Sequence, residues 1–171
     1  MPLFDALRMY EHYRTASGTL MNVNLEKAYI EDLSIRKFID LEIINLQTAV
    51  ENIYYQLVDC DNQEIIEINV TGSLISITEV NIYPELENWQ KALGDFLICL
   101  SANIMYDQKT KKAIAQITLN SIDMYNFNKD AADIFTGLPD NANGRFVVLG
   151  WAKSFVTKGR YLKYVMWDFH E

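Results

Sequence analysis

The chain has 171 residues, of which 50% are hydrophobic, 12% aromatic and 22% charged. This length suits one domain, and this composition excludes a disordered chain and a collagen-like or linker-rich protein. Lys and Arg number 15 and Asp and Glu number 23, so the formal net charge is −8. We expect no non-specific nucleic-acid binding, because an acidic surface repels a phosphate backbone.

The first part of the chain is predicted to be helical. Residues 2–16 begin with a proline and carry apolar side chains at helical spacing, which predicts a first helix. A longer apolar series, whose members follow one another by three or four positions, predicts a second helix over 34–58, with Ser34 as its cap. The members of this series are Ile39, Ile43, Leu46, Val50, Ile53 and Leu57.

From residue 61 onward the apolar pattern alternates, which is typical of strands. A polar turn at 107–111 between two alternating runs predicts a hairpin, and a second turn is predicted at 157–159. The predicted strands are 66–70, 74–83, 96–106, 113–119, 145–151 and 160–169.

The order of these elements, helices first and then strands, indicates the fold class. We predict a single α+β domain over the whole chain, residues 1–171. Its N-terminal helices (1–60) would pack on a mostly antiparallel twisted sheet or partial β-barrel (61–171).

The sequence offers few groups for nucleophilic or zinc chemistry. It has two cysteines, Cys60 and Cys99, and two histidines, His12 and His170. These counts exclude a disulfide framework and a histidine-rich zinc site, while a bridge between the two cysteines stays open. Because no glycine-rich phosphate-binding motif occurs either, carboxylates remain as the candidate functional groups.

Acidic and amide side chains gather at Asp123 and in the loop predicted over 124–144. Their oxygen atoms suit Mg²⁺ or Ca²⁺ rather than zinc. They are Asp123, Asn126, Asn128, Asp130 and Asp133. Arg145, near this loop, suits a bidentate phosphate contact or an ion pair with Asp140. The alternative is a purely structural loop, because Asn and Asp are common in turns.

The segment Asp123-x-Tyr125-Asn126-Phe127-Asn128 resembles the D-x-Y-D-F-N motif of colicin M and related lipid II-degrading bacteriocins. The order of helices and antiparallel strands is also similar to the activity domain of that family. The resemblance implies a Mg²⁺-dependent phosphodiesterase that cleaves the undecaprenyl–pyrophosphoryl bond of the peptidoglycan precursor in the periplasm. It also implies that Asp123 is the essential acidic residue and that Tyr125 lies beside it.

The sequence departs from that motif in two places. The family's second aspartate is Asn126 here, and its His-Arg pair falls at Ala132 and Asp133. Cleavage of a pyrophosphate linkage needs cationic or metal assistance at the leaving group. Either Asp130, Asp133 and Arg145 supply this assistance differently, or the fold persists without the reaction.

The first hypothesis is therefore an antibacterial effector domain that acts in the envelope of a target cell. Its catalytic residues would be Asp123, Tyr125, Asn126 and Arg145, with Mg²⁺ held by Asp123, Asp130 and Asp133. Its partners would be a lipid-linked peptidoglycan precursor and a cognate immunity protein or secretion carrier. We expect a carrier because residues 1–20 do not resemble a signal peptide, and we expect no transmembrane segment because no apolar run is long enough.

The second hypothesis is a non-enzymatic acidic binding module, such as an immunity protein or a secretion-system adaptor. The net charge of −8 suits electrostatic steering toward a basic partner. The ten tyrosines and three tryptophans are also residue types that protein interfaces favour.

Overall fold

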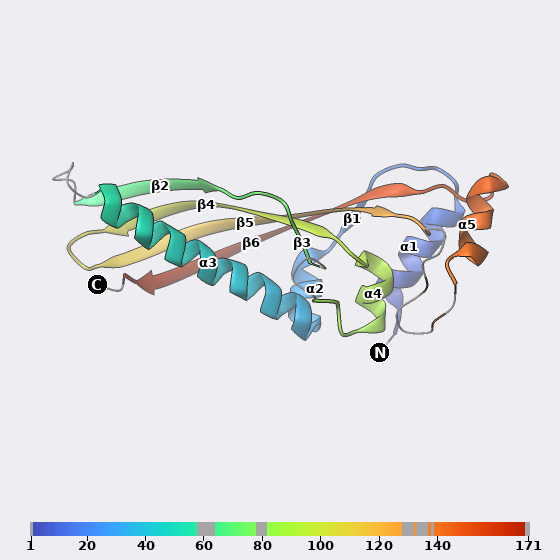
Figure 1. Cartoon of the computed structure of the whole chain (residues 1–171), viewed down its shortest axis with the longest axis horizontal. Helices are drawn as coiled ribbons and strands as arrows, with labels where there is room; N and C mark the ends of the chain where they lie inside the picture. The colour runs from blue at the N-terminus through green and yellow to red at the C-terminus, as the bar shows by residue number, and fades with distance from the viewer. Residues whose placement is uncertain are drawn as a thin grey trace.

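The computed structural model describes residues 2–57, 64–77, 82–127, 132, 137 and 139–169. A long, twisted sheet extends along most of the molecule (Figure 1). The described helices are α1 (Phe4–Arg14), α2 (Leu25–Glu31), α3 (Leu33–Leu57), α4 (Glu87–Leu93) and α5 (Asn141–Val148). The described strands are β1 (Met21–Val23), β2 (Ile65–Thr71), β3 (Ile75–Ser76), β4 (Leu97–Asp107), β5 (Lys112–Tyr125) and β6 (Phe155–Asp168).

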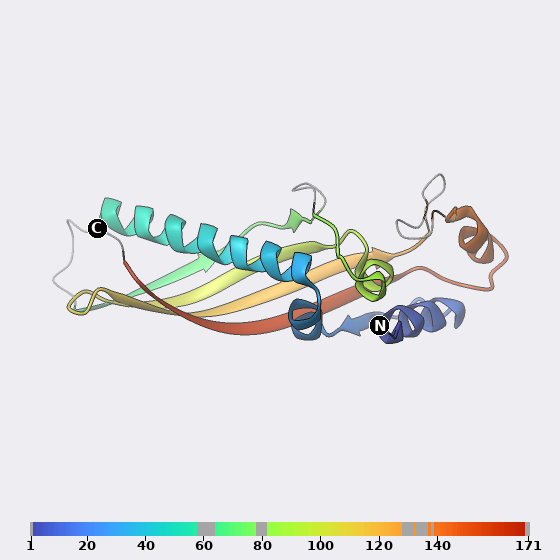
Figure 2. The same ribbon diagram turned by 90° about the horizontal axis from the view of Figure 1, so that it is seen from below.

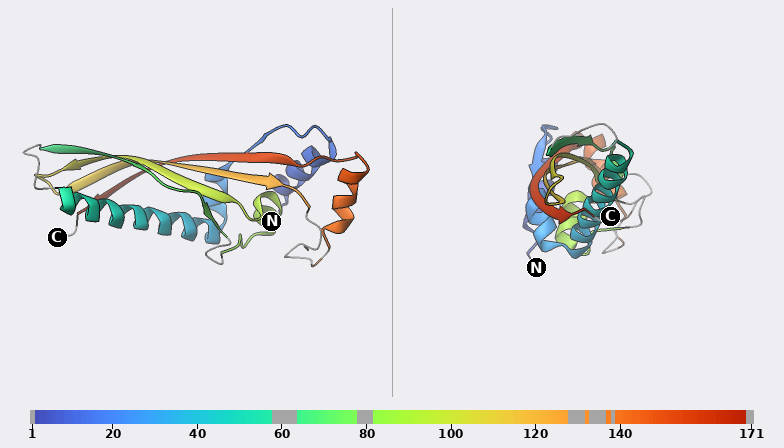
Figure 3. Two further views of the ribbon diagram at one scale, coloured as in Figure 1. Left: turned by 45° about the horizontal axis from the view of Figure 1, so that its top comes forward. Right: turned by 90° about the vertical axis from the view of Figure 1, so that its left-hand side faces the viewer.

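The sheet is mixed and open. Its strand order is β1-β6-β5-β4-β2, and β3 also pairs with β4. The pairs are antiparallel, apart from the parallel pair of β1 with β6. Seen from its end, the sheet curls partly around α3 without closing into a barrel (Figure 3). The α+β class predicted from the sequence is therefore confirmed.

The predicted hairpin is confirmed, and the structure gives its register. Tyr106 pairs with Ala113, and Asp107 pairs with Lys112. The carboxylate of Asp107 accepts hydrogen bonds from the backbone N–H groups of Lys109 (2.8 Å) and Thr110 (3.2 Å), which closes the turn. Alternation then directs the apolar side chains of both strands to the same face of the sheet.

Helix α3 covers that apolar face along one half of the sheet, while α1, α4 and α5 gather beyond its other half (Figure 2). The buried residues of α3 recur every three or four positions, as a helix packed on one face requires. They are Ile35, Phe38, Ile39, Ile43, Leu46, Val50 and Tyr54. Ile53, predicted to be buried, is 44% exposed, because the neighbouring Tyr54 faces the core instead.

The residue that caps α3 is Asp32 rather than the predicted Ser34. The buried Asp32 carboxylate accepts hydrogen bonds from the backbone N–H groups of Ser34 and Ile35, both at 3.0 Å. Its second oxygen accepts one from Leu86 N–H at 2.8 Å. Ser34 instead donates its hydroxyl to Glu85 (2.9 Å). The cap therefore also fastens the segment that precedes α4.

Two predictions for the last third of the chain are wrong. The strand predicted at 145–151 is replaced by helix α5 and the turn that follows it. The turn predicted at 157–159 lies inside β6. Gly159 is needed there for close packing, since a Cβ would lie 2.4 Å from Ser121 Oγ and 3.1 Å from Leu25 Cβ. A glycine in a strand often marks such an approach rather than a turn.

Several short elements have no counterpart in the prediction. Strand β1 and helix α2 lie between the two predicted helices, and α4 lies between β3 and β4. Cys99, in β4, is a free cysteine, so it does not form the bridge that stayed open. Cys60 lies outside the described residues. None of the helices in the described part of the chain is long and apolar enough to cross a membrane.

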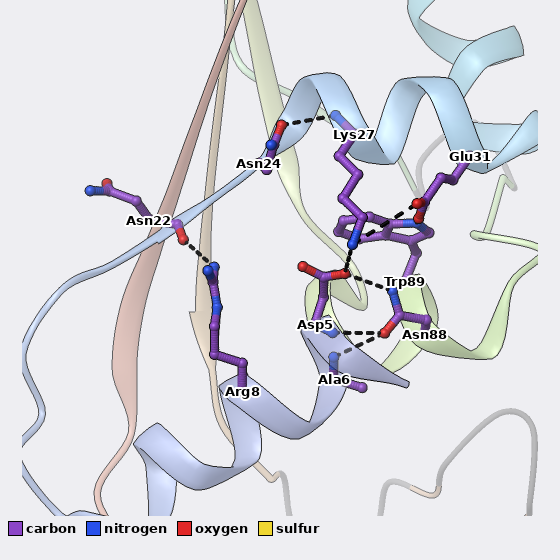
Figure 4. Close-up of polar contacts among 9 residues, drawn as sticks. All are labelled: Asp5, Ala6, Arg8, Asn22, Asn24, Lys27, Glu31, Asn88 and Trp89. Carbon is purple, nitrogen blue, oxygen red and sulfur yellow. Dashed lines mark hydrogen bonds and ion pairs between the residues drawn. The ribbon is translucent and has the colours of Figure 1, made fainter. Parts of the chain in front are cut away.

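A polar network fastens α1 to α2 and α4 (Figure 4). Lys27 forms an ion pair with Asp5 at 2.6 Å, and Trp89 donates its indole N–H to Glu31 at 3.0 Å. Burial opposes the charge of Asp5, but hydrogen bonds from Lys27 and Asn88 lower the pKa of its carboxyl below the usual value. This network therefore holds α1 against α2 and α4.

Candidate functional site

A cavity of about 840 Å³ lies where the end of β5 meets α1, α4 and the start of α5. From β5 and the residues after it come Asp123, Tyr125 and Asn126. Helix α4 and the residues after it contribute Lys91 and Asp95. The apolar part of the wall includes Leu3, Ala6, Leu7, Leu93, Met124 and Phe127.

The Asp123 carboxyl has an unusual proton affinity. Burial, followed by the charge of Asp95, raises its pKa from 3.8 to about 6, against the effect of a hydrogen bond from the Met124 backbone. Desolvation disfavours the charged form of a carboxyl, and a nearby negative charge acts in the same direction. Asp123 therefore exchanges its proton close to neutral pH, where a carboxyl is most useful in acid–base chemistry.

Asp95 is placed in the cavity by the end of α4. The helix stops at Gly94, whose positive φ of 57° favours glycine. Asp95 then accepts a hydrogen bond from Ser76 Oγ at 2.8 Å, which ties it to β3. Asp95 was not predicted as a site residue, because the residues around it in the chain form no recognisable functional motif. Only the fold brings it near Asp123.

Tyr125 lies in an aromatic cluster beside Asp123. Its ring stacks on Phe155 (5.0 Å between centroids) and meets the edges of Tyr13 (6.0 Å) and Phe127 (5.7 Å). Burial, with smaller contributions from Tyr10, Tyr13 and Asp140, raises the pKa of Tyr125 well above its usual value. Its hydroxyl therefore stays protonated and suits hydrogen-bond donation to a ligand oxygen.

Helix α5 is joined to this cluster by two tyrosines of α1. Tyr10 donates its hydroxyl to Asn143 Oδ1 (3.1 Å), and Tyr13 donates its hydroxyl to the Asn143 carbonyl oxygen (3.0 Å).

Gln90, in α4, donates to the Pro84 carbonyl oxygen (2.7 Å), while its buried Oε1 has no hydrogen-bond partner among the described residues. Gln90 also lines the cavity.

The predicted site residues do not all lie at the same cavity. Asp123, Tyr125 and Asn126 line one cavity. Arg145, predicted to contact phosphate, is exposed on α5 and is not part of that lining, because residues 141–148 form a helix instead of continuing the loop. The remaining predicted ligands, Asn128, Asp130 and Asp133, lie outside the described residues.

Lys91 is a cation of the cavity that the sequence analysis did not identify. Its ammonium group forms an ion pair with Glu87 one helical turn earlier, at 2.7 Å. Lys91 therefore brings a positive charge to the cavity. The His-Arg pair of the resembling motif is missing from this chain, which has Ala132 and Asp133 at those positions.

The described residues supply a limited set of metal ligands. They contain no group of three or more His, Cys, Asp or Glu side chains that fits a metal ion. Asp123 and Asp95 do share the cavity. Mg²⁺ is commonly bound by one or two carboxylates together with substrate phosphates, so this pair fits that mode of binding. The predicted Mg²⁺ dependence stays a prediction.

A second cavity, of about 720 Å³, contains none of the predicted site residues. It is lined by residues of β1, β5 and β6, including Asn120, Lys158 and Arg160. The predicted site residues Asp123, Tyr125 and Asn126 therefore line the first cavity and not this one.

No protein-family model matches the chain, and no curated protein matches it. The fold is similar to a solved structure, that of PaeM, a colicin M-like bacteriocin produced by Pseudomonas aeruginosa, with a TM-score of 0.55 and 11% sequence identity. The match covers 98% of this chain and 52% of the PaeM chain, so this chain spans about half the length of that protein. The chain therefore has a colicin M-like fold, and the fold implied by the motif resemblance is confirmed.

Proposed function

We propose that this chain is an antibacterial toxin domain that acts in the cell envelope on a lipid-linked peptidoglycan precursor. The observation that carries the proposal is that one chain has both the colicin M-like fold and the segment that resembles the D-x-Y-D-F-N motif. The similarity to PaeM extends over 98% of the chain, and Asp123 and Tyr125 of the motif line one cavity.

The lining of the cavity supports an amphiphilic substrate. The lining includes charged side chains, those of Asp95, Asp123 and Lys91, as well as apolar ones such as Leu3 and Leu7. A lipid-linked pyrophosphate likewise combines a charged head with an apolar chain. Binding sites of this kind are mostly apolar, with a few polar groups that orient the ligand.

The proposed reaction is hydrolysis of a phosphate ester. Its active form would have the Asp123 carboxylate deprotonated, as required of a general base or an oxygen ligand. The Tyr125 hydroxyl, which stays protonated, would donate a hydrogen bond to a phosphate oxygen. Lys91 would supply positive charge near the leaving group in place of the missing His-Arg pair.

Mg²⁺ remains part of this proposal. When bound, it would neutralise charge on the pyrophosphate. Asp123 and Asp95 are the described carboxylates that would hold it. Asp130 and Asp133, predicted for the same role, are outside the described residues.

Expression in a bacterium, with and without an added periplasmic signal peptide, tests the proposal. We expect lysis only when the chain is exported, and loss of lysis in Asp123→Asn, which keeps the shape of the side chain. Asp168→Asn, an exposed carboxylate of β6, is the matched control and should kill like the unmodified chain. Harmless export of folded protein would contradict the proposal and favour the acidic binding module.

A further inference from the structure

The end of α5 exposes consecutive apolar side chains. We call Val147, Val148, Leu149, Gly150 and Trp151 the α5 tip. The exposed fractions are 41% for Val147, 87% for Val148, 56% for Leu149 and 58% for Trp151. Single exposed apolar residues are ordinary on a protein surface, but a run of them, with an exposed tryptophan, is typical of an interaction site.

Backbone N–H groups of the α5 tip donate hydrogen bonds to carbonyl oxygens of the same helix and turn. Leu149 N–H donates to the Arg145 carbonyl oxygen (3.0 Å), and Gly150 N–H donates to that of Val147 (3.0 Å). Trp151 N–H donates to the Phe146 carbonyl oxygen (2.8 Å). The left-handed Gly150 (φ 72°) makes this turn possible. These internal bonds lower the cost of moving the N–H groups out of water, because a lipid environment penalises unpaired backbone groups.

Cations surround the α5 tip. Arg145 precedes it, Lys153 follows it, and both are exposed. Arg14 lies over the ring of Phe146, 3.9 Å from its centroid, and Phe146 stacks with Trp151. Residues 141–153, which include the α5 tip, carry Arg145 and Lys153 and no Asp or Glu, in a chain whose net charge is −8. This local positive charge is complementary to an anionic surface.

The α5 tip lies at one end of the elongated molecule, beyond the sheet (Figures 1 and 2). The first turn of the same helix lines the cavity of Asp123 through Ala142 and Asn143. A surface that binds the α5 tip is therefore brought within one short helix of that cavity.

We propose that the α5 tip inserts into the interfacial region of an anionic phospholipid bilayer, with Arg145, Lys153 and Arg14 contacting lipid phosphates. Tryptophan and small aliphatic side chains flanked by cations are the residue types that bind at this depth. The membrane contact itself does not depend on the proposed function, but its purpose does. Insertion of the α5 tip would bring the Asp123 cavity to the surface where a lipid-linked substrate is embedded.

Vesicle co-sedimentation tests this inference without any need for catalysis. We expect the whole chain to bind vesicles of phosphatidylglycerol and phosphatidylethanolamine. Binding to neutral phosphatidylcholine vesicles should be at least tenfold weaker, and binding to the anionic vesicles should weaken as salt is added. Equal binding to both kinds of vesicle, or no binding to either, would overturn the proposal.

Variants separate the α5 tip from other exposed apolar positions. Val148→Asp should lower anionic vesicle binding at least tenfold and should not change folding, because the side chain is 87% exposed. Met166→Asp, at a 65% exposed position on β6, is the matched control and should bind like the unmodified chain. Equal binding by Val148→Asp and the unmodified chain would contradict the role of the tip.

The vesicle and killing experiments together test the membrane proposal and the proposed function separately. Asp123→Asn should bind vesicles normally and should not kill. If the chain binds anionic vesicles but does not kill when exported, the proposed function fails and this inference stands. If it kills but Val148→Asp binds and kills equally well, the inference fails and the proposed function stands.

Discussion

Asn88 caps helix α1 through Asp5, although the two residues are 83 positions apart in the sequence. The Asn88 side-chain oxygen accepts hydrogen bonds from the backbone N–H groups of Asp5 (3.0 Å) and Ala6 (3.1 Å). Its amide group donates to the Asp5 carboxylate at 3.0 Å (Figure 4). Leu3, which precedes the helix, provides no side-chain cap. The start of α1, and with it one wall of the cavity, therefore depends on a side chain of α4.

We expect Asn88→Ala to destabilise the protein by about 2 kcal/mol, because buried N–H groups of α1 would lose their acceptor. Urea denaturation followed by circular dichroism measures this change. Asn22→Ala is the matched control, since the described contact of Asn22 uses its backbone carbonyl oxygen, which accepts from Arg8 at 2.7 Å. Equal stability of the two variants would contradict the capping role of Asn88.

Protonation of Asp123 should make stability depend on pH. Its pKa is raised to about 6, so between the usual value of 3.8 and that value the folded state binds more protons than the unfolded state. The free energy of unfolding should therefore fall as pH rises through this range. We expect Asp123→Asn to remove this slope and to raise stability above pH 7 by about 2 to 3 kcal/mol. Parallel slopes in both proteins would contradict the burial argument.

Asp95 should tune the proton affinity of Asp123. Because its negative charge contributes to the raised pKa, Asp95→Asn should lower the pKa of Asp123. A carbon-13 NMR titration of the Asp123 carboxyl measures this directly. Asp168→Asn should leave the titration unchanged. If the chain cleaves its proposed substrate, the rising limb of the pH profile should shift in the same direction.

Gly159 should tolerate no side chain. An added Cβ would lie 2.4 Å from Ser121 Oγ, so Gly159→Ala should destabilise the protein by about 1 to 3 kcal/mol. Removing the clashing oxygen in the double variant with Ser121→Ala should restore part of this loss, while the contact with Leu25 Cβ at 3.1 Å remains. Thermal unfolding of the unmodified chain, the two single variants and the double variant provides the comparison. An additive effect of the two substitutions would contradict a direct clash.

Local patterns in the sequence were sufficient for the hairpin and the long helix. Both were predicted because strand alternation and helical spacing are repeated over many residues. The motif residues Asp123 and Tyr125 were predicted to act together because they lie two positions apart in the chain, and their catalytic role stays a prediction.

Tertiary structure decided what no local pattern records. Asp32 rather than Ser34 caps α3, and Asn88 caps α1, because the donors and acceptors come from distant segments. Residues 145–151 have apolar side chains that suit a strand, yet residues 141–148 form a helix, whose Asn143 is bound by Tyr10 and Tyr13.

The candidate site shows the same division. The sequence by itself predicted an acidic and amide-rich loop that contains Tyr125 and directly follows Asp123. The structure shows instead that strand β5 continues through Tyr125. Only the tertiary structure brought Asp95 and Lys91 to the same cavity and left Arg145 outside its lining. The physical reason is that periodicity reports which face of an element is buried, whereas a site is made by side chains from different elements, whose meeting depends on how those elements pack.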